Sequence, residues 1–145
     1  NDKIVAVSTS DSQTEELWDG SVVRVNVDGS VDQNFGTNGW YRYAGGVEDT
    51  SQFNRFKTEI VYDILTAETG DIYYCGRTYI PVPANSSQYI PGTGASFIIK
   101  LKSDGTPDAS FGNNGLVIID VSPGYEDLAL AMTRIKVFLR NGNKK

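Results

Sequence analysis

The sequence predicts an all-β fold, and three features carry that prediction. Short runs rich in Val, Ile, Tyr and Thr alternate with clusters of Gly, Asn, Asp and Pro, as strands alternate with turns. The 145 residues include 15 glycines and 8 tyrosines, which suits a chain of many turns and half-buried strands. One segment occurs twice in identical register, at residues 28–39 and 104–115, which indicates an architecture assembled from repeated units.

Both copies of the repeated segment read D-G-[ST]-x-D-x-[NS]-F-G-x-N-G. Each copy follows a short apolar run that contains one basic residue, and each precedes a second run of aromatic or β-branched residues. We interpret the shared positions as structural, because a feature repeated in register is expected to serve the fold. These positions are Asp28, Gly29, Asp32, Phe35, Gly36 and Gly39 in the first copy, and Asp104, Gly105, Asp108, Phe111, Gly112 and Gly115 in the second.

Each residue type in the repeat predicts a local role. Asp28 and Asp104 precede glycine, so their carboxylates are expected to accept backbone N–H groups in Asx-turns. The glycines allow positive φ angles. Phe35 and Phe111 are expected to be equivalent, buried anchors beneath their loops, and the second aspartate of each copy is expected to bind loop amides.

Residues 58–121 form the clearest unit, because four apolar runs are separated by turn signals. A short turn is expected at residues 68–70, and the Pro-, Ser- and Gly-rich segment 80–95 is expected to be a long loop. The runs predict strands at residues 60–66, 72–78, 97–102 and 116–121. Together they predict one four-stranded antiparallel sheet.

The repeated motif resembles the bacterial delta-60 repeat, in which a similar segment follows a strand with a basic residue. The strand that precedes the motif in that family has a counterpart at residues 70–76 and a degenerate one at residues 2–8. The spacing between the two copies is longer than that family's usual repeat. The resemblance implies β-propeller blades within a large secreted or cell-surface bacterial protein, and hence an extracellular or cell-surface location. It implies a scaffold and no particular reaction.

On this resemblance, the chain is expected to cover about two blades of a larger propeller. Residues 1–43 would supply strands two to four of one blade, residues 58–121 a complete blade, and residues 127–145 the start of the next. Two blades are too few to close a ring, so other blades or other chains are expected to complete it. A ring of several chains and an excerpt of a longer propeller both fit. The excerpt is favoured because both ends fall inside a blade.

The composition excludes several kinds of chemistry. The chain has no histidine, so it cannot contain a Ser-His-Asp or Cys-His nucleophile pair. Its single cysteine, Cys75, permits neither an internal disulfide nor a zinc site and is expected to be a buried small residue. The net charge of −5 disfavours nucleic acid, and no apolar run is long enough for a membrane helix. We therefore expect that the chain is not an enzyme.

The repeated loops carry oxygen-bearing side chains at alternate positions, a spacing similar to that of an EF-hand calcium loop. The match fails where that loop needs glycine, because Gln33 and Ala109 stand there. It fails again where a bidentate glutamate is needed, because Gly39 and Gly115 stand there. Metal-free turns and no cofactor are therefore expected, with calcium as the alternative.

Function is expected in the segments that are not repeated, at residues 9–20, 44–57 and 80–95. Trp18 and Tyr89 lie in two of them among polar residues and are candidate ligand contacts. One hypothesis is a structural, adhesive or protein-interaction module that contacts a cell-surface protein through these segments. The alternative is a glycan-binding or glycan-hydrolysing propeller domain that uses loop carboxylates and aromatics.

Overall fold

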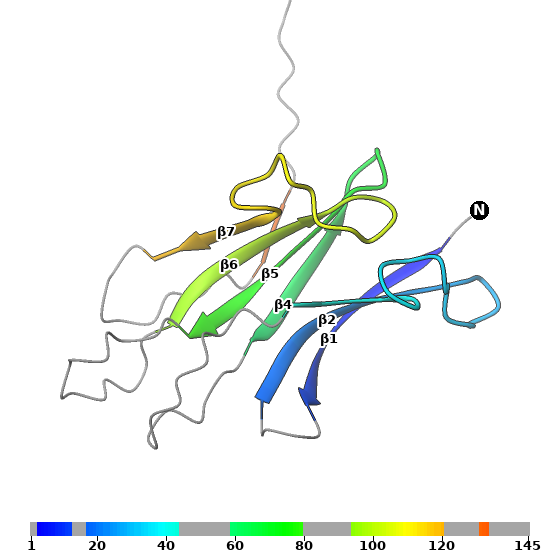
Figure 1. Cartoon of the computed structure of the whole chain (residues 1–145), viewed down its shortest axis with the longest axis horizontal. Helices are drawn as coiled ribbons and strands as arrows, with labels where there is room; N and C mark the ends of the chain where they lie inside the picture. Colours follow the sequence, from blue (N-terminus) through cyan, green and yellow to red (C-terminus); the bar gives the residue numbers. More distant parts are fainter. Residues whose placement is uncertain (1–2, 13–16, 44–58, 80–93, 121–130, 134–145) are drawn as a thin grey trace, which may run out of the picture.

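The computed structural model describes residues 3–12, 17–43, 59–79, 94–120 and 131–133. Within these ranges the ordered elements are strands and turns, and they form two antiparallel sheets of three and four strands (Figure 1). The prediction of an all-β fold with blade-like antiparallel sheets is confirmed. In this part of the chain there is no helix with the length and apolarity needed to cross a membrane.

The first sheet has the order β1-β2-β3, with β1 at Ile4–Ser12, β2 at Leu17–Val25 and β3 at Trp40–Tyr43. The β1–β2 hairpin is longer than predicted, because pairing continues from Ile4 opposite Val25 to Ser12 opposite Leu17. The prediction that residues 9–20 form a loop was therefore wrong. Polar side chains do not end a hairpin, since the ladder is made by backbone groups that every residue except proline supplies in full.

The second sheet has the order β4-β5-β6-β7, with β4 at Ile60–Thr66, β5 at Ile72–Tyr79, β6 at Gly94–Leu101 and β7 at Leu116–Ile119. The predicted four-stranded antiparallel sheet is confirmed. Strand β6 begins earlier than the apolar run suggested, because the small residues before Phe97 are buried and continue the pairing with β5. A side chain at Gly94 would meet Arg77, so a small residue is needed there.

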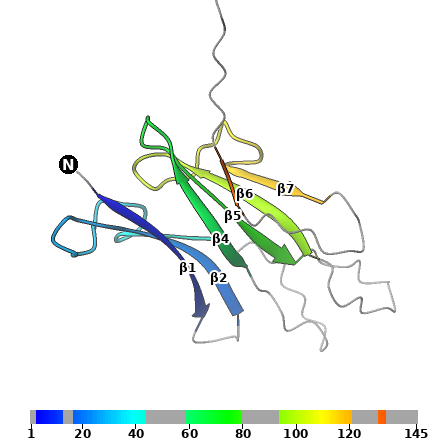
Figure 2. The same cartoon turned by 180° about the vertical axis from the view of Figure 1, so that it is seen from behind.

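The two sheets pack against each other, with β1 and β2 next to β4 (Figures 1 and 2). The approach is close, because a Cβ atom at Gly20 would lie 2.9 Å from the Val61 side chain. Aromatic rings join the sheets across the interface, with 5.2 Å between the ring centroids of Tyr43 and Phe97. The buried core comprises Val22, Phe35, Ile72, Tyr74, Phe97, Ile99 and Leu101. This core draws residues from both sheets, so each sheet depends on the other for its burial.

Some expectations fall outside the described residues. The segment 44–57 and most of residues 127–145, the predicted start of a next blade, belong to this group. Residues 131–133 are described, and the backbone N–H of Met132 donates to Asp63 Oδ2 on β4 at 2.7 Å.

Candidate functional site

The two copies of the repeated segment fold into the same loop. Equivalent backbone hydrogen bonds close both, such as Phe35 N–H to Asp32 O at 3.0 Å and Phe111 N–H to Asp108 O at 2.9 Å. The equivalent residues Asn38 and Asn114 also share a left-handed backbone, with φ of 53° and 51°. The sequence repeat is therefore a structural repeat as well.

The first aspartate of each copy forms the predicted Asx-turn. Asp28 Oδ1 accepts both the backbone N–H and the hydroxyl of Ser30, at 3.0 and 2.6 Å. Asp104 Oδ1 accepts the same two groups of Thr106, at 2.9 and 2.6 Å. The hydroxyl contact is the main reason that the pKa of each carboxyl lies below its usual value. Both side chains hold the turn that contains the following glycine.

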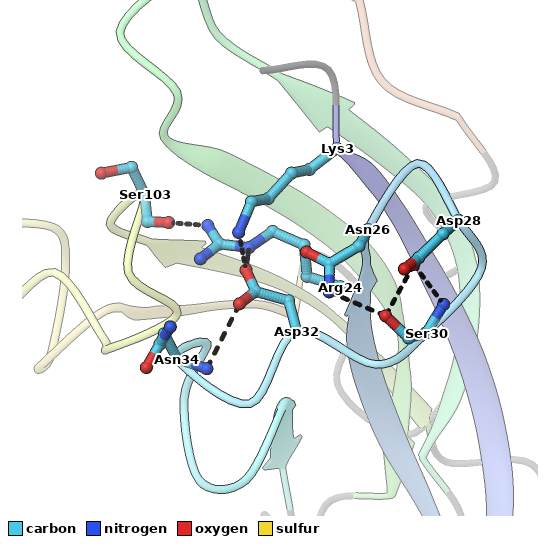
Figure 3. A network of polar contacts seen from close by, with 8 residues as sticks. All are labelled: Lys3, Arg24, Asn26, Asp28, Ser30, Asp32, Asn34 and Ser103. Atoms are coloured by element: carbon cyan, nitrogen blue, oxygen red, sulfur yellow. Dashed lines mark hydrogen bonds and ion pairs between the residues drawn. The ribbon is translucent and has the colours of Figure 1, made fainter.

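The second aspartate of the first copy lies at the centre of an ion-pair network (Figure 3). Asp32 is only 3% exposed. Its Oδ2 atom lies 2.5 Å from Lys3 Nζ and 2.6 Å from Arg24 Nε. Its Oδ1 atom also accepts the backbone N–H of Asn34 at 3.3 Å, which is the predicted contact with a loop amide. The network ties β1 and β2 to the first loop.

The second copy has a simpler version of this network. Asp108 Oδ2 lies 2.5 Å from Lys100 Nζ, and its Oδ1 accepts the backbone N–H of Ser110 at 3.0 Å. Lys100 also lies 3.4 Å from Asp71 Oδ2. Sequence reasoning had noted a basic residue before each repeat but did not assign it this role. The sequence did contain a signal for this role, because the basic residue and the second aspartate stand at the same spacing in both copies.

The ion pairs of Asp32 and Asp108 affect whether the repeated loops could bind calcium. Asp32 faces two cationic side chains and Asp108 faces one, so a metal ion would have to displace them or share a carboxylate with them. Among the described residues no three His, Cys, Asp or Glu side chains are grouped as metal ligands. The geometry favours metal-free turns, which stays a prediction.

The first loop docks directly on the second. The backbone N–H of Gly36 donates to Asp104 O at 2.8 Å. Phe35 lies beneath the Asp104–Gly105 turn, because a Cβ atom at Gly105 would be 2.8 Å from the Phe35 ring. The Phe35 ring is 0% exposed as a result. We call this contact between the copies the loop junction.

Arg24 connects the junction to the ion-pair network. Its guanidinium lies 4.7 Å from the centroid of the Phe35 ring, in cation–π geometry. Its Nε binds Asp32 while its Nη1 donates to the backbone carbonyl of Ser103 in the second copy (Figure 3). One side chain thus fixes the first loop internally and joins it to the second.

The prediction that both phenylalanines are equally buried was wrong for Phe111. Phe35 is fully buried, whereas Phe111 is only half-buried and packs edge-on against Tyr73, with 5.9 Å between ring centroids. The reason is the loop junction. The turn that covers Phe35 belongs to the next copy, and the described part of the chain contains no third copy to cover Phe111.

The candidate ligand contacts are not brought together by the described structure. Trp18 lies in β2, opposite Asp11 of β1, and therefore belongs to the hairpin and not to a loop. Tyr89 lies outside the described residues. Their role in binding stays a prediction.

The sequence did not predict a buried polar pair of the second sheet, which lies where the first sheet packs against it. Glu59 is 1% exposed and accepts a hydrogen bond from Thr78 Oγ1 at 3.2 Å. Burial raises the pKa of Tyr43 to about 12, with a further contribution from Glu59. A glutamate before an apolar strand gives no signal of burial in the sequence, because its environment is created by the other sheet.

Acid is expected to destabilise the fold through Asp32. The pKa of this carboxyl falls from 3.8 to about 2, chiefly because Lys3 and also because Arg24 bind the ionised form. Since the folded pKa lies below the unfolded one, the stabilisation is present above about pH 4 and is lost as the pH falls toward 2. Asp32→Asn should flatten this part of the pH dependence. Urea unfolding between pH 2 and 5 measures it.

Gln33→Ala is the matched control for this variant. It changes an exposed residue of the same loop and removes no titratable group, so the pH dependence below pH 4 should stay close to that of the unmodified chain. Parallel pH curves for the unmodified chain and Asp32→Asn would contradict the assignment to Asp32.

Comparison with known proteins agrees with this geometry. The chain matches the model of a family described as a domain of unknown function (DUF5122) beta-propeller. The match covers residues 1–35 and 85–111. The two segments span less than half of the chain and end on the equivalent residues Phe35 and Phe111. No curated protein and no solved structure matches the chain. The match supports a propeller-like repeat family, in which the two sheets correspond to blades.

Proposed function

We propose that the chain is a structural and protein-interaction module of a secreted or cell-surface bacterial protein. The observation that carries the proposal is that the repeated loops lie at one end of the sheets, whereas the strands that flank the unrepeated segments end at the other. The two Asp-Gly loops gather at one end of the strands (Figures 1 and 2). Their aspartates hold turns and ion pairs, which leaves the opposite end for contacts with other molecules.

The described strands that flank the unrepeated segments all end at that opposite end. The strand pairs that mark this end are Ser12–Leu17, Gly20–Tyr43 and Tyr79–Gly94. Trp18 is the second residue of β2 and so lies at the same end. Segments that depart side by side from rigid strands are well placed to form one binding surface, because a scaffold fixes their roots.

The motif supports a more specific assignment to delta-60 repeats, and with it an extracellular or cell-surface location. The proposed role is adhesive and not enzymatic. A chain without histidine lacks the common general base near neutral pH, and the aspartates of its repeat are engaged by their own loops. The partner proposed is a protein on a cell surface.

Binding of chain-coated fluorescent beads to intact bacterial cells tests this role. Binding should fall when the cells are treated with protease and should survive periodate, which oxidises glycans. Trp18→Ala and Tyr89→Ala should weaken binding. Gln33→Ala, at an exposed residue of a repeated loop, should leave it unchanged.

Two outcomes would count against the proposal. Loss of binding after periodate alone would point to a glycan, and an equal loss in Gln33→Ala would place binding at the wrong end of the sheets. Fractionation of cells that produce the parent protein tests its location, which should be the culture medium or the cell envelope.

A further inference from the structure

Among the described residues the loop junction is made once, although the sequence contains both of its halves twice. One half is an Asp-Gly turn, which Asp104–Gly105 supplies. The other half is a Phe-Gly face, which Phe35–Gly36 supplies. The unused halves are the Asp28–Gly29 turn and the Phe111–Gly112 face.

The unused turn has the same shape as the used one. Gly29 and Gly105 have φ of 84° and 87°, and both follow an aspartate in an Asx-turn. Their surroundings differ. Gly105 is buried against Phe35, whereas Gly29 is exposed and a Cβ atom there would meet nothing within 4 Å. The Asp28–Gly29 turn is therefore free to dock.

The unused face also matches its counterpart. Gly36 and Gly112 have φ of 52° and 54°, so their N–H groups follow the same loop path. The Gly36 N–H donates to Asp104 O, whereas no described residue accepts the N–H of Gly112 through a backbone bond. Beside it, Phe111 is half-buried where Phe35 is fully buried. Within the described part of the chain, this face has no backbone acceptor for one N–H and no turn over one ring, and an Asp-Gly turn supplies both.

We propose that the Asp28–Gly29 turn of a second copy of this chain docks on the Phe111–Gly112 face, so that chains join head to tail. In the contact, Gly112 N–H donates to Asp28 O and Gly29 covers the Phe111 ring, as Gly105 covers Phe35 within the chain. The proposal concerns the end of the sheets opposite to the proposed binding surface and does not depend on the adhesive role.

The contact between chains differs from the internal junction at one position. Within the chain, Ser103 precedes the docking turn and its carbonyl accepts a bond from Arg24. The equivalent residue before the free turn is Val27, which is 77% exposed. The residue equivalent to Arg24 is Lys100, so docking places the backbone carbonyl of Val27 near a lysine already paired with Asp108 and Asp71. Without the arginine bond the contact is weaker, so assembly should depend on concentration.

A head-to-tail contact is heterologous, so it produces a closed ring or an open filament. Propellers typically have four to eight blades. At two blades a chain, a closed ring would hold about two to four chains. Assembly through this face would bring the sheets of successive chains side by side, as the loop junction does within the chain.

Substitutions at Lys100 test the geometry without a change of net charge. In sedimentation velocity over a concentration series, Lys100→Arg should strengthen association, because it supplies the bond that Arg24 makes to the residue before the docking turn. Lys102→Arg makes the same change at an exposed residue outside the face and should leave association unchanged. General self-repulsion predicts no difference between the two variants, since both keep the net charge of −5.

A mixing experiment tests the direction of the contact. Gly29→Asn keeps a residue tolerated at positive φ but blocks the turn, and Phe111→Ala removes the ring from the face. Each variant alone should be monomeric. An equimolar mixture should form a dimer, because the intact turn of Phe111→Ala meets the intact face of Gly29→Asn. Gln33→Ala, on the same loop but outside the contact, should assemble like the unmodified chain.

Three results would overturn the proposal. They are a monomeric unmodified chain at every concentration, equal association of Lys100→Arg and Lys102→Arg, and a mixture that stays monomeric. Circular dichroism and thermal melts establish that each variant is folded, and the comparison of Lys100→Arg with Lys102→Arg decides the matter if Phe111→Ala is not.

Discussion

Phe35→Ala is expected to lower the free energy of unfolding by about 3–5 kcal/mol, the range for truncation of a fully buried aromatic ring. Phe35 is 0% exposed and lies between the Arg24 guanidinium and the Asp104–Gly105 turn. Its removal leaves a cavity at the point where the two copies meet. The cation–π contact with Arg24 is lost at the same time.

Phe111→Ala is the matched control, because it removes the same ring from the equivalent position of the second loop. Phe111 is half-buried and keeps only its edge-on contact with Tyr73 on this side, so a smaller loss of about 1–2 kcal/mol is expected. Urea unfolding at a concentration where the chain is monomeric gives both values. Equal losses would show that the loop junction adds nothing to the stability of the first loop.

The parts of the fold that the sequence predicted well are those set by local pattern. The predicted strand at residues 60–66 agrees with β4 at Ile60–Thr66, since the apolar run there is followed by turn residues. The Asx-turns of Asp28 and Asp104 also follow from residue order, because each side chain bonds a group two residues away. Such features need no knowledge of the rest of the chain.

The features that sequence reasoning missed depend on distant contacts. The polar stretch before Ser12 reads as a loop, yet it pairs with the start of β2 in the long hairpin. Glu59 is buried only because the first sheet covers it. Lys3 is far from Asp32 in sequence, and only the β1–β2 pairing brings the two together.

The unequal burial of Phe35 and Phe111 shows a further limit of prediction from the local sequence. The two loops are identical at seven of twelve positions and have the same internal backbone hydrogen bonds, so each predicts the same environment for its phenylalanine. In a repeat architecture the environment of one unit is completed by its neighbour. The place of each copy in the series of repeats, and not its local sequence, decides which phenylalanine ring is covered.

Gly105→Ala is expected to be more damaging than the same change at Gly29. Both glycines have φ near +85°, where a Cβ atom costs roughly 1–2 kcal/mol in either turn. At Gly105 the new atom would also lie 2.6 Å from Gly36 N and 2.8 Å from the Phe35 ring. Overpacking of this kind adds about 1–3 kcal/mol. The total expected for Gly105→Ala is therefore about 2–5 kcal/mol.

The comparison with Gly29→Ala isolates the loop junction, because the backbone strain is common to both variants and cancels in the difference. At Gly29 the added Cβ atom meets nothing within 4 Å, so strain alone should remain. The cycle formed with Phe35→Ala then measures the coupling. Once the ring is gone, an alanine at position 105 keeps its close contact with Gly36 N but loses the one with the ring, so the double variant should lose less stability than the sum of the single losses. Strict additivity would mean that Phe35 and Gly105 do not interact, and the junction would have to be held by the Gly36–Asp104 hydrogen bond and Arg24 alone.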